Sequence, residues 1–510
     1  MKMRRALLSV YDKTGIAEFA RSLVELGWSL YASSGTFRLL RGEGIEAEET
    51  AEIMGYPNLM GGRVKTLHPA IFGGILARRE NPADMKEIDE FSIPLVDMIV
   101  CNLLPFEQAA RERPPLDELI ERIDIGGASM LRAGAKNYRH VVVVTEPGDY
   151  RMVTEELKAE GDVSLPTREH LAIKAFSATA SYDGNVAFGL KEAIGFSDPD
   201  LPPIIPLGLR RRLLLRYGEN PHQEAALYLP PLAELPWEQL SGRLLSYNNI
   251  LDVDCAMRGC AMLQGDCGAL VVQHASPCGM AIGRTPLEAY GRAHDCDPVS
   301  AYGGVVGISR RVDVETVRAL VDRFVDVLVA PGYDDAALAL ISEKKPALRV
   351  LRWKGGRVLQ YQITGTWSGF LVQEDALPPL PDIRRESAWI GRPRPDLEKD
   401  LLLAWRAAAL SKSNAVAVVK DGASVGIGGG FCNRLHAVDF ALRLAGDRSR
   451  GAVLGSDAFF HLPDAIELAA DAGITAIIQP GGSIRDEEVF TAAEKRGLSM
   501  FISDRRTFRH

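Results

Sequence analysis

The chain has 510 residues, which is too many for one hydrophobic core, so its length predicts two to four domains. An apolar fraction of 46% with 25% charged residues is typical of a water-soluble globular enzyme, and a net charge of −8 disfavours a nucleic-acid partner. No apolar run approaches the ~18 residues of a membrane span, and too few apolar residues follow the basic N-terminus for a signal peptide. Seven scattered cysteines indicate reduced thiols and favour the cytoplasm.

The first 195 residues alternate strand-like and helix-like patterns. Apolar periodicity predicts a buried strand, an amphipathic helix, a second strand and a turn into another helix, over residues 5–11, 14–26, 28–32 and 33–36. This is the βαβ rhythm of an open parallel sheet, in which ligands bind beyond the carboxyl ends of the strands. We therefore expect Ser9, Lys13 and the turn to border one crevice. A small Gly-bearing turn that opens a helix suits a phosphate.

Two later segments of this part carry polar side chains. Residues 61–69 (GGRVKTLHP) combine two cations and a hydroxyl with flexible backbone, which fits a solvated loop as well as a binding loop. A buried strand is predicted over 97–104. The segment 123–130 is a glycine turn, followed by a helix that reaches Lys136. We expect Asp124 and Lys136 to face one crevice, where a carboxylate and an ammonium can manage the proton transfers of a ring closure.

Proline density predicts the domain boundary. A long helix is expected over 166–195, and the next thirteen residues contain four prolines, which fit neither a helix nor a central strand. The predicted domains are 1–196 and 209–510, joined by a Pro-rich linker at 197–208. A second Pro- and charge-rich run, near 384–400, is expected to divide the second domain into two subdomains.

The stretch 270–283 (LVVQHASPCGMAIG) is the first candidate for chemistry in the second part. A β-branched run is interrupted by polar residues and then resumes, which predicts a strand that delivers side chains into a cleft. Pro277 and Gly279 predict a turn here. His274 can exchange a proton near neutral pH at such a strand end, although spacing alone favours a hydrogen-bonded structural histidine.

The second part contains a weak internal repeat. The sequence of strand, polar turn and Gly-rich strand at 269–283 returns at 414–430, and residues 300–302 have a counterpart in 456–460. Two related subdomains would explain this repeat.

Two other classes of site are disfavoured. The region around His274 lacks a closely spaced ligand pair for structural zinc, and it also lacks the general-acid Glu and the second Cys of zinc deaminases. The segment 426–434 is a poor dinucleotide-binding motif, because Phe431 stands where the third glycine should be.

Taken together, the motifs resemble those of the bifunctional AICAR transformylase/IMP cyclohydrolase family over essentially the full length. The similar motifs are, in order, SVYDKTG, SGT, RVKTLHP, IDIGGASM with a downstream AKN, RYGENPHQ, HASPCG, DPVSAYGG, APGY, KSNA, SDAFF, IIQPGGSIRD and RTFRH. The resemblance implies an α/β fold with an N-terminal methylglyoxal-synthase-like parallel-sheet domain. It also implies a C-terminal transformylase domain of two cytidine-deaminase-like subdomains, and a homodimer.

The resemblance also implies the last two steps of IMP synthesis. AICAR would take a formyl group from 10-formyltetrahydrofolate with His274 as the base, and FAICAR would then close to IMP with Lys65, Asp124 and Lys136 as catalytic groups. The implied nucleotide-binding residues are Ser9, Lys13, Ser34, Gly35, Thr36, Arg63, Thr66, Gly126 and Gly127 in the first domain, and Arg216, Tyr217, Asn249, Gln273, Gly303, Asp326, Asn414, Phe459 and Arg506 in the second. The implied folate-binding residues are Val299, Arg434, His461 and Asp464. No metal, nucleic acid or membrane is expected to take part.

The chain departs from the family pattern at four positions near these residues. Gln273 replaces a lysine, Phe431 a glutamine, His461 a proline and Leu104 a tyrosine. The resemblance implies that the lysine stabilises or protonates the departing folate nitrogen. Three interpretations therefore stay open: a working bifunctional enzyme, a cyclohydrolase whose transformylase is weak or uses another formyl donor, and a non-catalytic purine-nucleotide-binding protein. The retained proton-transfer groups argue against the third.

Overall fold

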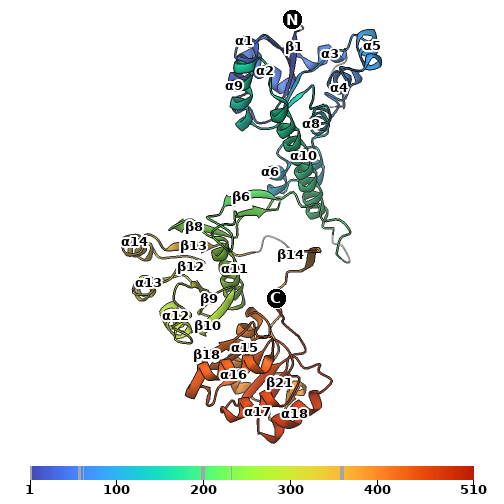
Figure 1. The fold of residues 1–510 in the computed structure, drawn as a ribbon. Coiled ribbons are helices and arrows are strands. Elements are labelled where there is room, and N and C mark those ends of the chain that lie inside the picture. Colours follow the sequence, from blue (N-terminus) through green and yellow to red (C-terminus); the bar gives the residue numbers. More distant parts are fainter. Residues whose placement is uncertain (1–2, 56–58, 61–62, 197–200, 231, 357–360) are drawn as a thin grey trace. The chain divides into compact units, whose positions relative to one another are not determined.

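The computed structural model describes residues 3–55, 59–60, 63–196, 201–230, 232–356 and 361–510 (Figure 1). The chain forms two compact units, Met1–Arg210 with Leu229–Ala233, and Arg211–Tyr228 with Glu234–His510. Within the predicted linker, residues 197–200 lie outside the described residues, and 201–208 form neither helix nor strand. Among the helices of the described ranges, none combines the length and the apolar run needed to cross a membrane.

The first unit is built on a five-stranded parallel sheet with the order β3-β2-β1-β4-β5. Its strands are β1 (Arg4–Ser9), β2 (Trp28–Ala32), β3 (Glu48–Glu49), β4 (Met98–Cys101) and β5 (Val142–Val144). Its helices are α1 (Ile16–Glu25), α2 (Ser34–Gly42), α3 (Thr50–Met54), α4 (Pro69–Leu76), α5 (Pro82–Glu90), α6 (Phe106–Arg111), α7 (Leu116–Ile120), α8 (Gly126–Lys136), α9 (Tyr150–Glu160) and α10 (Leu165–Ile194).

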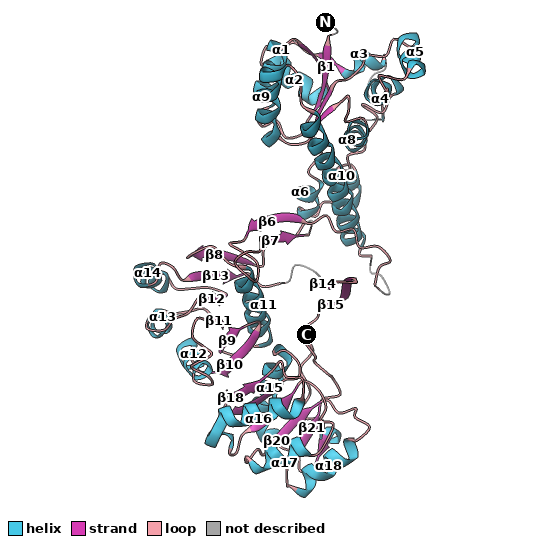
Figure 2. Ribbon diagram, in the orientation of Figure 1, coloured by secondary structure: helices cyan, strands magenta, loops and turns pink. Residues whose placement is uncertain are grey.

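Helices cover both faces of this sheet (Figure 2). Successive strand residues point to opposite sides, and the apolar residues on each side are buried by helices. On β1, Ala6 and Leu8 pack against α1, α2 and α9, whereas Leu7 packs on the opposite face with α4 and α8. The predicted parallel-sheet rhythm is therefore confirmed. The strand expected over 97–104 is shorter than predicted, since β4 ends at Cys101.

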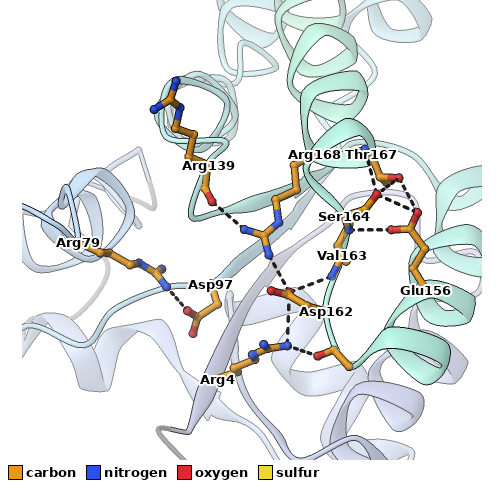
Figure 3. Close-up of polar contacts among 11 residues, drawn as sticks. Arg4, Arg79, Asp97, Arg139, Glu156, Asp162, Val163, Ser164, Thr167 and Arg168 are labelled. Atoms are coloured by element: carbon orange, nitrogen blue, oxygen red, sulfur yellow. Dashed lines mark hydrogen bonds and ion pairs between the residues drawn. The ribbon is translucent and has the colours of Figure 1, made fainter.

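Polar contacts hold the amino-terminal edge of the sheet together (Figure 3). Arg4, at the start of β1, pairs with Asp162 at 3.4 Å, and Arg168 of α10 pairs with the same carboxylate at 2.7 Å. The Arg168 guanidinium also donates to the carbonyl oxygen of Arg139 at 2.7 Å. These links attach α10 to the sheet at the end opposite to the carboxyl ends of the strands, where a ligand site is expected.

The second unit contains two small antiparallel pairs and one large sheet. The strands are β6 (Arg210–Leu214), β7 (Ala226–Leu229), β8 (Trp237–Ser241), β9 (Gly268–Gln273), β10 (Ser276–Ile282), β11 (Val305–Ile308), β12 (Val327–Ala330), β13 (Arg349–Trp353), β14 (Tyr361–Thr366), β15 (Gly369–Glu374), β16 (Trp389–Ile390), β17 (Val416–Lys420), β18 (Ala423–Gly428), β19 (Val453–Ser456), β20 (Ala476–Gln479) and β21 (Ser499–Ile502). The helices are α11 (Tyr247–Met262), α12 (Pro286–His294), α13 (Val314–Val321), α14 (Asp335–Lys344), α15 (Glu398–Leu410), α16 (Arg434–Ala445), α17 (Asp464–Asp471) and α18 (Asp486–Lys495).

The twelve strands of the large sheet form two halves with the same topology. The order β16-β21-β20-β19-β17-β18 is mirrored by β10-β9-β11-β12-β13-β8, and the hairpin strands β18 and β10 meet at the centre as an antiparallel pair. Each half runs from a first strand through a helix into a hairpin and then through three helix–strand steps. The large sheet therefore consists of two halves of the same topology within one compact unit.

The internal repeat predicted from the sequence is correct for the two hairpin segments and wrong for residues 300–302 and 456–460. The segment 269–283 contains the hairpin β9–β10, and the segment 414–430 contains the hairpin β17–β18. Residues 300–302, however, precede β11, whereas 456–460 begin at the end of the equivalent strand β19. This second correspondence is wrong because the similar residues lie at opposite ends of equivalent strands.

One face of the large sheet carries α11 and α15 side by side, and their apolar residues form a single core with residues of both halves. Trp405 of α15 is 1% exposed at its centre, and burial of so large a side chain contributes roughly 3 kcal/mol. The other face is covered separately, by α12, α13 and α14 in the first half and by α16, α17 and α18 in the second. The two hairpins are therefore held by a shared core on one side.

Candidate active sites

A cavity of about 730 Å³ opens at the carboxyl ends of the strands in the first unit. It lies beside β1 and β4, where the strand order changes direction, which is the usual ligand position in such sheets. Asn102, directly after β4, bridges this point: its Oδ1 accepts hydrogen bonds from the backbone N–H groups of Tyr11 at 2.6 Å and Asp12 at 2.9 Å. The loop after β1 is thereby fixed beside the cavity.

One side of the cavity suits an anion. The Thr36 hydroxyl, 1% exposed as a residue, accepts a hydrogen bond from the Val10 N–H at 3.1 Å and lies 3.1 Å from the Lys13 ammonium. The Ser33 hydroxyl donates to Ser9 Oγ at 2.9 Å rather than capping the first turn of α2. Burial lowers the pKa of Lys13, so an anion bound here would favour its charged form. The predicted crevice of Ser9, Lys13 and the α2 turn is confirmed.

The same cavity is lined by Asp124, whose carboxylate is held in a fixed orientation. Its Oδ1 accepts the Gly127 N–H at 2.8 Å, and the Asp124 N–H donates to the Tyr182 hydroxyl at 2.6 Å. A Cβ on Gly127 would lie 2.8 Å from Asp124 Oδ2, and a Cβ on Gly126 would lie 2.7 Å from Thr66 Oγ1. The two glycines are therefore needed for the close approach of the turn to these side chains.

The loop before α4 lines the same cavity with two cations and a hydroxyl. Residues 61–62 of the predicted segment lie outside the described residues, but Arg63, Lys65 and Thr66 are described and border the cavity. Arg63 is exposed and pairs with Glu121, which lowers the pKa of that carboxyl. Within the part of the chain that the structure describes, Lys65 has no carboxylate partner. Its ammonium is thus available to a ligand.

Lys136 does not line this cavity, so the expectation that it faces the crevice with Asp124 is wrong within one chain. Gly126 and Lys136 are the first and last residues of α8, and a rise of 1.5 Å per residue separates them by about 15 Å. Lys136 is exposed in a different depression of about 570 Å³, lined by residues such as Arg139 and His140.

In the second unit His274 lies at the tip of the β9–β10 hairpin. His274 and Ala275 form its two-residue turn, with φ of 53° and 58°, and the His274 side chain is exposed. The turn predicted at Pro277 and Gly279 is therefore wrong. Both lie within β10, and Gly279 serves a different purpose, because a Cβ there would lie 1.9 Å from the Ala293 carbonyl oxygen of α12.

Three polar residues meet near the amino end of α11. Asn249 Nδ2 donates to Asp326 Oδ2 at 2.8 Å, and Arg349 pairs with Asp326 Oδ1 at 2.5 Å. Asn249 is 8% exposed and Arg349 6% exposed. The structure thus brings the predicted residues Asn249 and Asp326 together, and adds Arg349, which the sequence analysis missed.

A second polar group lies in the other half of the large sheet. The Arg434 guanidinium donates to Asn414 Oδ1 at 2.8 Å and Ser456 Oγ at 2.9 Å, and it also pairs with Asp457. Arg434 is 6% exposed and Asp457 is fully buried. Asn414 and Arg434 are therefore in contact, and most of the Arg434 side chain lies inside the protein.

The remaining predicted residues of the second unit are exposed or half-buried. Gln273 Nε2 donates to the Tyr302 carbonyl oxygen at 2.8 Å, and Gly303 has a φ of 77°. Arg216 stacks over Tyr217 at 5.3 Å, Arg506 over Phe508 at 4.5 Å, and Phe459 edge-on with His461 at 4.9 Å, while Val299 is 86% exposed and Asp464 begins α17.

The C-terminal segment joins these groups. Arg509 Nη1 donates to the carbonyl oxygens of Ala275 and Leu410, the latter at 2.8 Å, and its own carbonyl accepts the Ser413 N–H at 2.9 Å. Sequence reasoning missed Arg509, together with Asp252, whose Oδ1 accepts the Ala275 N–H. Arg509 lies in the RTFRH motif, whereas Asp252 lies in none of the motifs that carry the resemblance, and the partners of both are distant in sequence.

Family models match both parts of the chain and define its class. Residues 15–129 match the model of the MGS-like domain, in agreement with the parallel sheet of the first unit. Residues 134–444 match the model described as "AICARFT/IMPCHase bienzyme". The bifunctional purine biosynthesis protein PurH of Persephonella marina is 42% identical over 99% of this chain and 100% of its own length, and the Bacillus subtilis protein of the same name is 40% identical over 100% of both.

The chain belongs to this family of bifunctional purine biosynthesis enzymes, which formylate AICAR and cyclise the product to IMP. A solved structure titled "Crystal structure of ForH" is 40% identical over 37% of this chain and 99% of its own, with a TM-score of 0.34. The AICAR formylation of the family implies a folate co-substrate.

Proposed function

We propose that the second unit transfers the formyl group of 10-formyltetrahydrofolate to AICAR and that the first unit closes FAICAR to IMP. The observation that carries the proposal is the cavity where the start of α2, Lys13, Lys65 and Asp124 meet. The protein acts on these small molecules as a cytoplasmic homodimer, and needs no metal, nucleic acid or membrane.

Ring closure requires two proton transfers that the first unit is equipped to manage. The carboxamide nitrogen of FAICAR attacks the formyl carbon, and the formyl oxygen leaves as water with one proton lost by that nitrogen and one lost by the formamido nitrogen as the new C=N bond forms. Asp124, held by the Gly127 N–H at 2.8 Å, is oriented to take the proton from the attacking nitrogen. Lys65, which has no carboxylate partner among the described residues, stabilises the oxygen as it gains negative charge. Lys13 and the start of α2 hold the substrate phosphate.

Formyl transfer joins the 5-amino nitrogen of AICAR to the formyl carbon and breaks the bond from that carbon to the folate nitrogen. The amine must lose a proton, and the departing nitrogen must gain one. His274, exposed at the hairpin tip, takes the first proton. Gln273 beside it can donate a hydrogen bond to the departing nitrogen but cannot supply a proton.

The direct test supplies purified protein with AICAR and one formyl donor at a time, and follows IMP. The donors are 10-formyltetrahydrofolate, 5-formyltetrahydrofolate, and formate with ATP. We expect IMP with the first donor alone. IMP from another donor would overturn the assignment of the co-substrate, and cyclisation of supplied FAICAR without formyl transfer would leave only the first unit's activity.

Gln273 gives a sharper prediction about the departing folate nitrogen. Its amide Nε2 is already directed to the Tyr302 carbonyl oxygen at 2.8 Å. A Gln273→Lys change should raise the rate of formyl transfer by roughly 10- to 1000-fold, which is the usual effect of one positioned acid or charge. The measurement is the initial rate with saturating AICAR and 10-formyltetrahydrofolate.

His461 is the alternative source of that proton, since it is exposed and packs against Phe459 at 4.9 Å. If His461 is the acid, His461→Ala lowers the parent rate, whereas His436→Ala, an exposed histidine on α16, does not. A faster Gln273→Lys protein with no effect of His461→Ala points to a weakened site or another donor. If neither variant changes the rate, residue 273 has no part in proton delivery.

The homodimer has support from the β14–β15 hairpin, a separate two-stranded sheet. Its Trp367 is 108% exposed and its Phe370 79% exposed. A lone hairpin of this kind is marginally stable in water, and so apolar a tip is typical of an interaction surface. A second copy of the chain is the occupant we propose.

The double change Trp367→Ser and Phe370→Ser is expected to shift the protein toward monomer and to lower formyl transfer with it. Light scattering at the assay concentration measures the mass. The control is Phe91→Ser, which removes an aromatic side chain that is 68% exposed in the first unit. A parent protein that is monomeric and active at that concentration would end the proposal.

A further inference from the structure

The two halves of the large sheet present equivalent hairpins with different turn residues. In the first half the turn consists of His274 and Ala275, and in the second of Asp421 and Gly422. All four residues have positive φ, of 53°, 58°, 51° and 78° in that order. Two-residue hairpin turns of this kind favour Asn or Asp followed by Gly. The second half therefore has the usual turn residues, and the first half does not.

An aspartate from the preceding helix holds each turn. Asp400 of α15 accepts the Asp421 N–H at 2.9 Å and the Gly422 N–H at 2.6 Å. Asp252 of α11 accepts the N–H of Ala275, the second residue of the other turn. The aspartate contact is thus part of the duplicated scaffold. In the second half, where the turn has no histidine, Asp400 holds the turn backbone.

The aspartate contact opposes more backbone strain in the first half than in the second. A residue other than glycine is strained in the left-handed region, and here both turn residues are of that kind. Arg509 adds a restraint from the other side, through its hydrogen bond to the Ala275 carbonyl oxygen. Ala275 is 9% exposed, whereas the His274 side chain is exposed. The backbone is therefore fixed while the imidazole remains open to a substrate.

We propose that Asp252 is a positioning residue for His274: its carboxylate fixes the strained turn, and its negative charge stabilises the imidazolium that forms when His274 takes a proton from the substrate amine. The proposal rests on the proposed formyl transfer. Asp252 does not touch the reacting atoms, and it acts through the turn and through its charge.

The charges around Asp252 fit this role. Burial raises the pKa of Asp252, and hydrogen bonds from the backbone of Ala275 and His274 together with the charge of His274 oppose that rise. Asp326 is a like charge nearby that also raises it. Arg509 faces the same region from the C-terminal segment, where it contacts Cys255 of α11 at 3.6 Å.

The test compares Asp252→Asn with its counterpart Asp400→Asn. Both keep an oxygen acceptor of nearly the same shape and remove one charge. We expect Asp252→Asn to lower kcat for formyl transfer by about 10- to 100-fold, with KM for AICAR changed less than about threefold. Without the carboxylate the imidazolium is less stable, so the acid limb of the kcat profile should move to lower pH. Asp400→Asn should leave kcat within about twofold.

Further measurements separate structure from chemistry. Cyclisation of supplied FAICAR by the Asp252→Asn protein should equal that of the parent. Asp252→Glu, which restores the charge, should return the acid limb toward the parent position even if the turn is less stable. The pH midpoint of the His274 ring resonance by NMR, in the Asp252→Asn protein against the parent, reports the same charge effect without any turnover.

Equal kcat and equal pH profiles for Asp252→Asn and the parent would overturn the inference. So would an equal loss in Asp400→Asn, because the contact would then be general scaffold. An NMR midpoint unchanged by Asp252→Asn would remove the electrostatic role. A parent protein that formylates no AICAR would instead overturn the proposed function, and the NMR comparison still decides whether Asp252 acts on His274.

Discussion

His274→Asn is expected to lower formyl transfer from 10-formyltetrahydrofolate to AICAR by ~10²- to 10⁴-fold, the usual cost of losing a positioned general base. Asparagine tolerates the left-handed region and is favoured at the first position of such a turn, so the hairpin should be kept. The amide cannot take up a proton at neutral pH. The loss should therefore appear in kcat, measured as tetrahydrofolate released under saturating substrates.

The matched control is Asp421→Asn, the same new residue at the equivalent position of the second hairpin. It should leave both activities unchanged, and His274→Asn should leave the cyclisation of supplied FAICAR unchanged. A His274→Asn protein that transfers the formyl group at the parent rate would show that the base is elsewhere.

Asp124→Asn should have an effect of similar size in the first unit, lowering cyclisation of FAICAR by ~10²- to 10⁴-fold. The asparagine oxygen can still accept the Gly127 N–H that holds Asp124 at 2.8 Å, so the turn before α8 should be kept. Formyl transfer should continue, and FAICAR should accumulate when AICAR and 10-formyltetrahydrofolate are supplied. Chromatography of the reaction mixture measures both products.

Asp117→Asn, on the exposed surface of α7, is the control for loss of one negative charge in this unit. Lys136→Ala belongs in the same series, because Lys136 lies at the far end of α8 from Asp124. A loss in Lys136→Ala as large as that in Asp124→Asn would mean that Lys136 reaches the cavity from a partner subunit. Cyclisation at the parent rate by Asp124→Asn would remove Asp124 from the mechanism.

The elements with strong periodicity could be predicted from the sequence. The strand expected over 28–32 is β2, and the helix expected over 166–195 is α10, which ends one residue earlier. Their apolar patterns repeat at the strand and helix periods, and their ends carry clear signals such as Gly195 after α10. The crevice of Ser9, Lys13 and the α2 turn followed from the same rhythm, because the carboxyl ends of neighbouring parallel strands meet at one edge.

The positions of the hairpin turn and of Lys136 could not be predicted in this way. The turn at His274 and Ala275 lacks the glycine that two-residue turns usually contain. The prediction therefore relied on Pro277 and Gly279 and placed the turn about three residues too late in the sequence. Lys136 was placed beside Asp124 by its closeness in sequence. Helix α8 lies between them, and its first and last residues, Gly126 and Lys136, are about 15 Å apart.

Contacts between distant segments could not be predicted at all. Asp326 meets Arg349, and the C-terminal Arg509 meets Ala275, because separate strands and loops bring them together. None of these pairs has a spacing that periodicity could reveal. The equivalence of Asp252 and Asp400 likewise emerges only when the two hairpins are compared in space.

The most direct test of the whole account is the formation of IMP by the purified full chain from AICAR and 10-formyltetrahydrofolate, with His274→Asn and Asp124→Asn measured beside it. The account predicts IMP from the parent, unreacted AICAR with His274→Asn, and accumulated FAICAR with Asp124→Asn. A mixture of the two variants that makes no more IMP than either variant alone would contradict two separate, successive active sites, as would a parent that binds AICAR and never releases IMP.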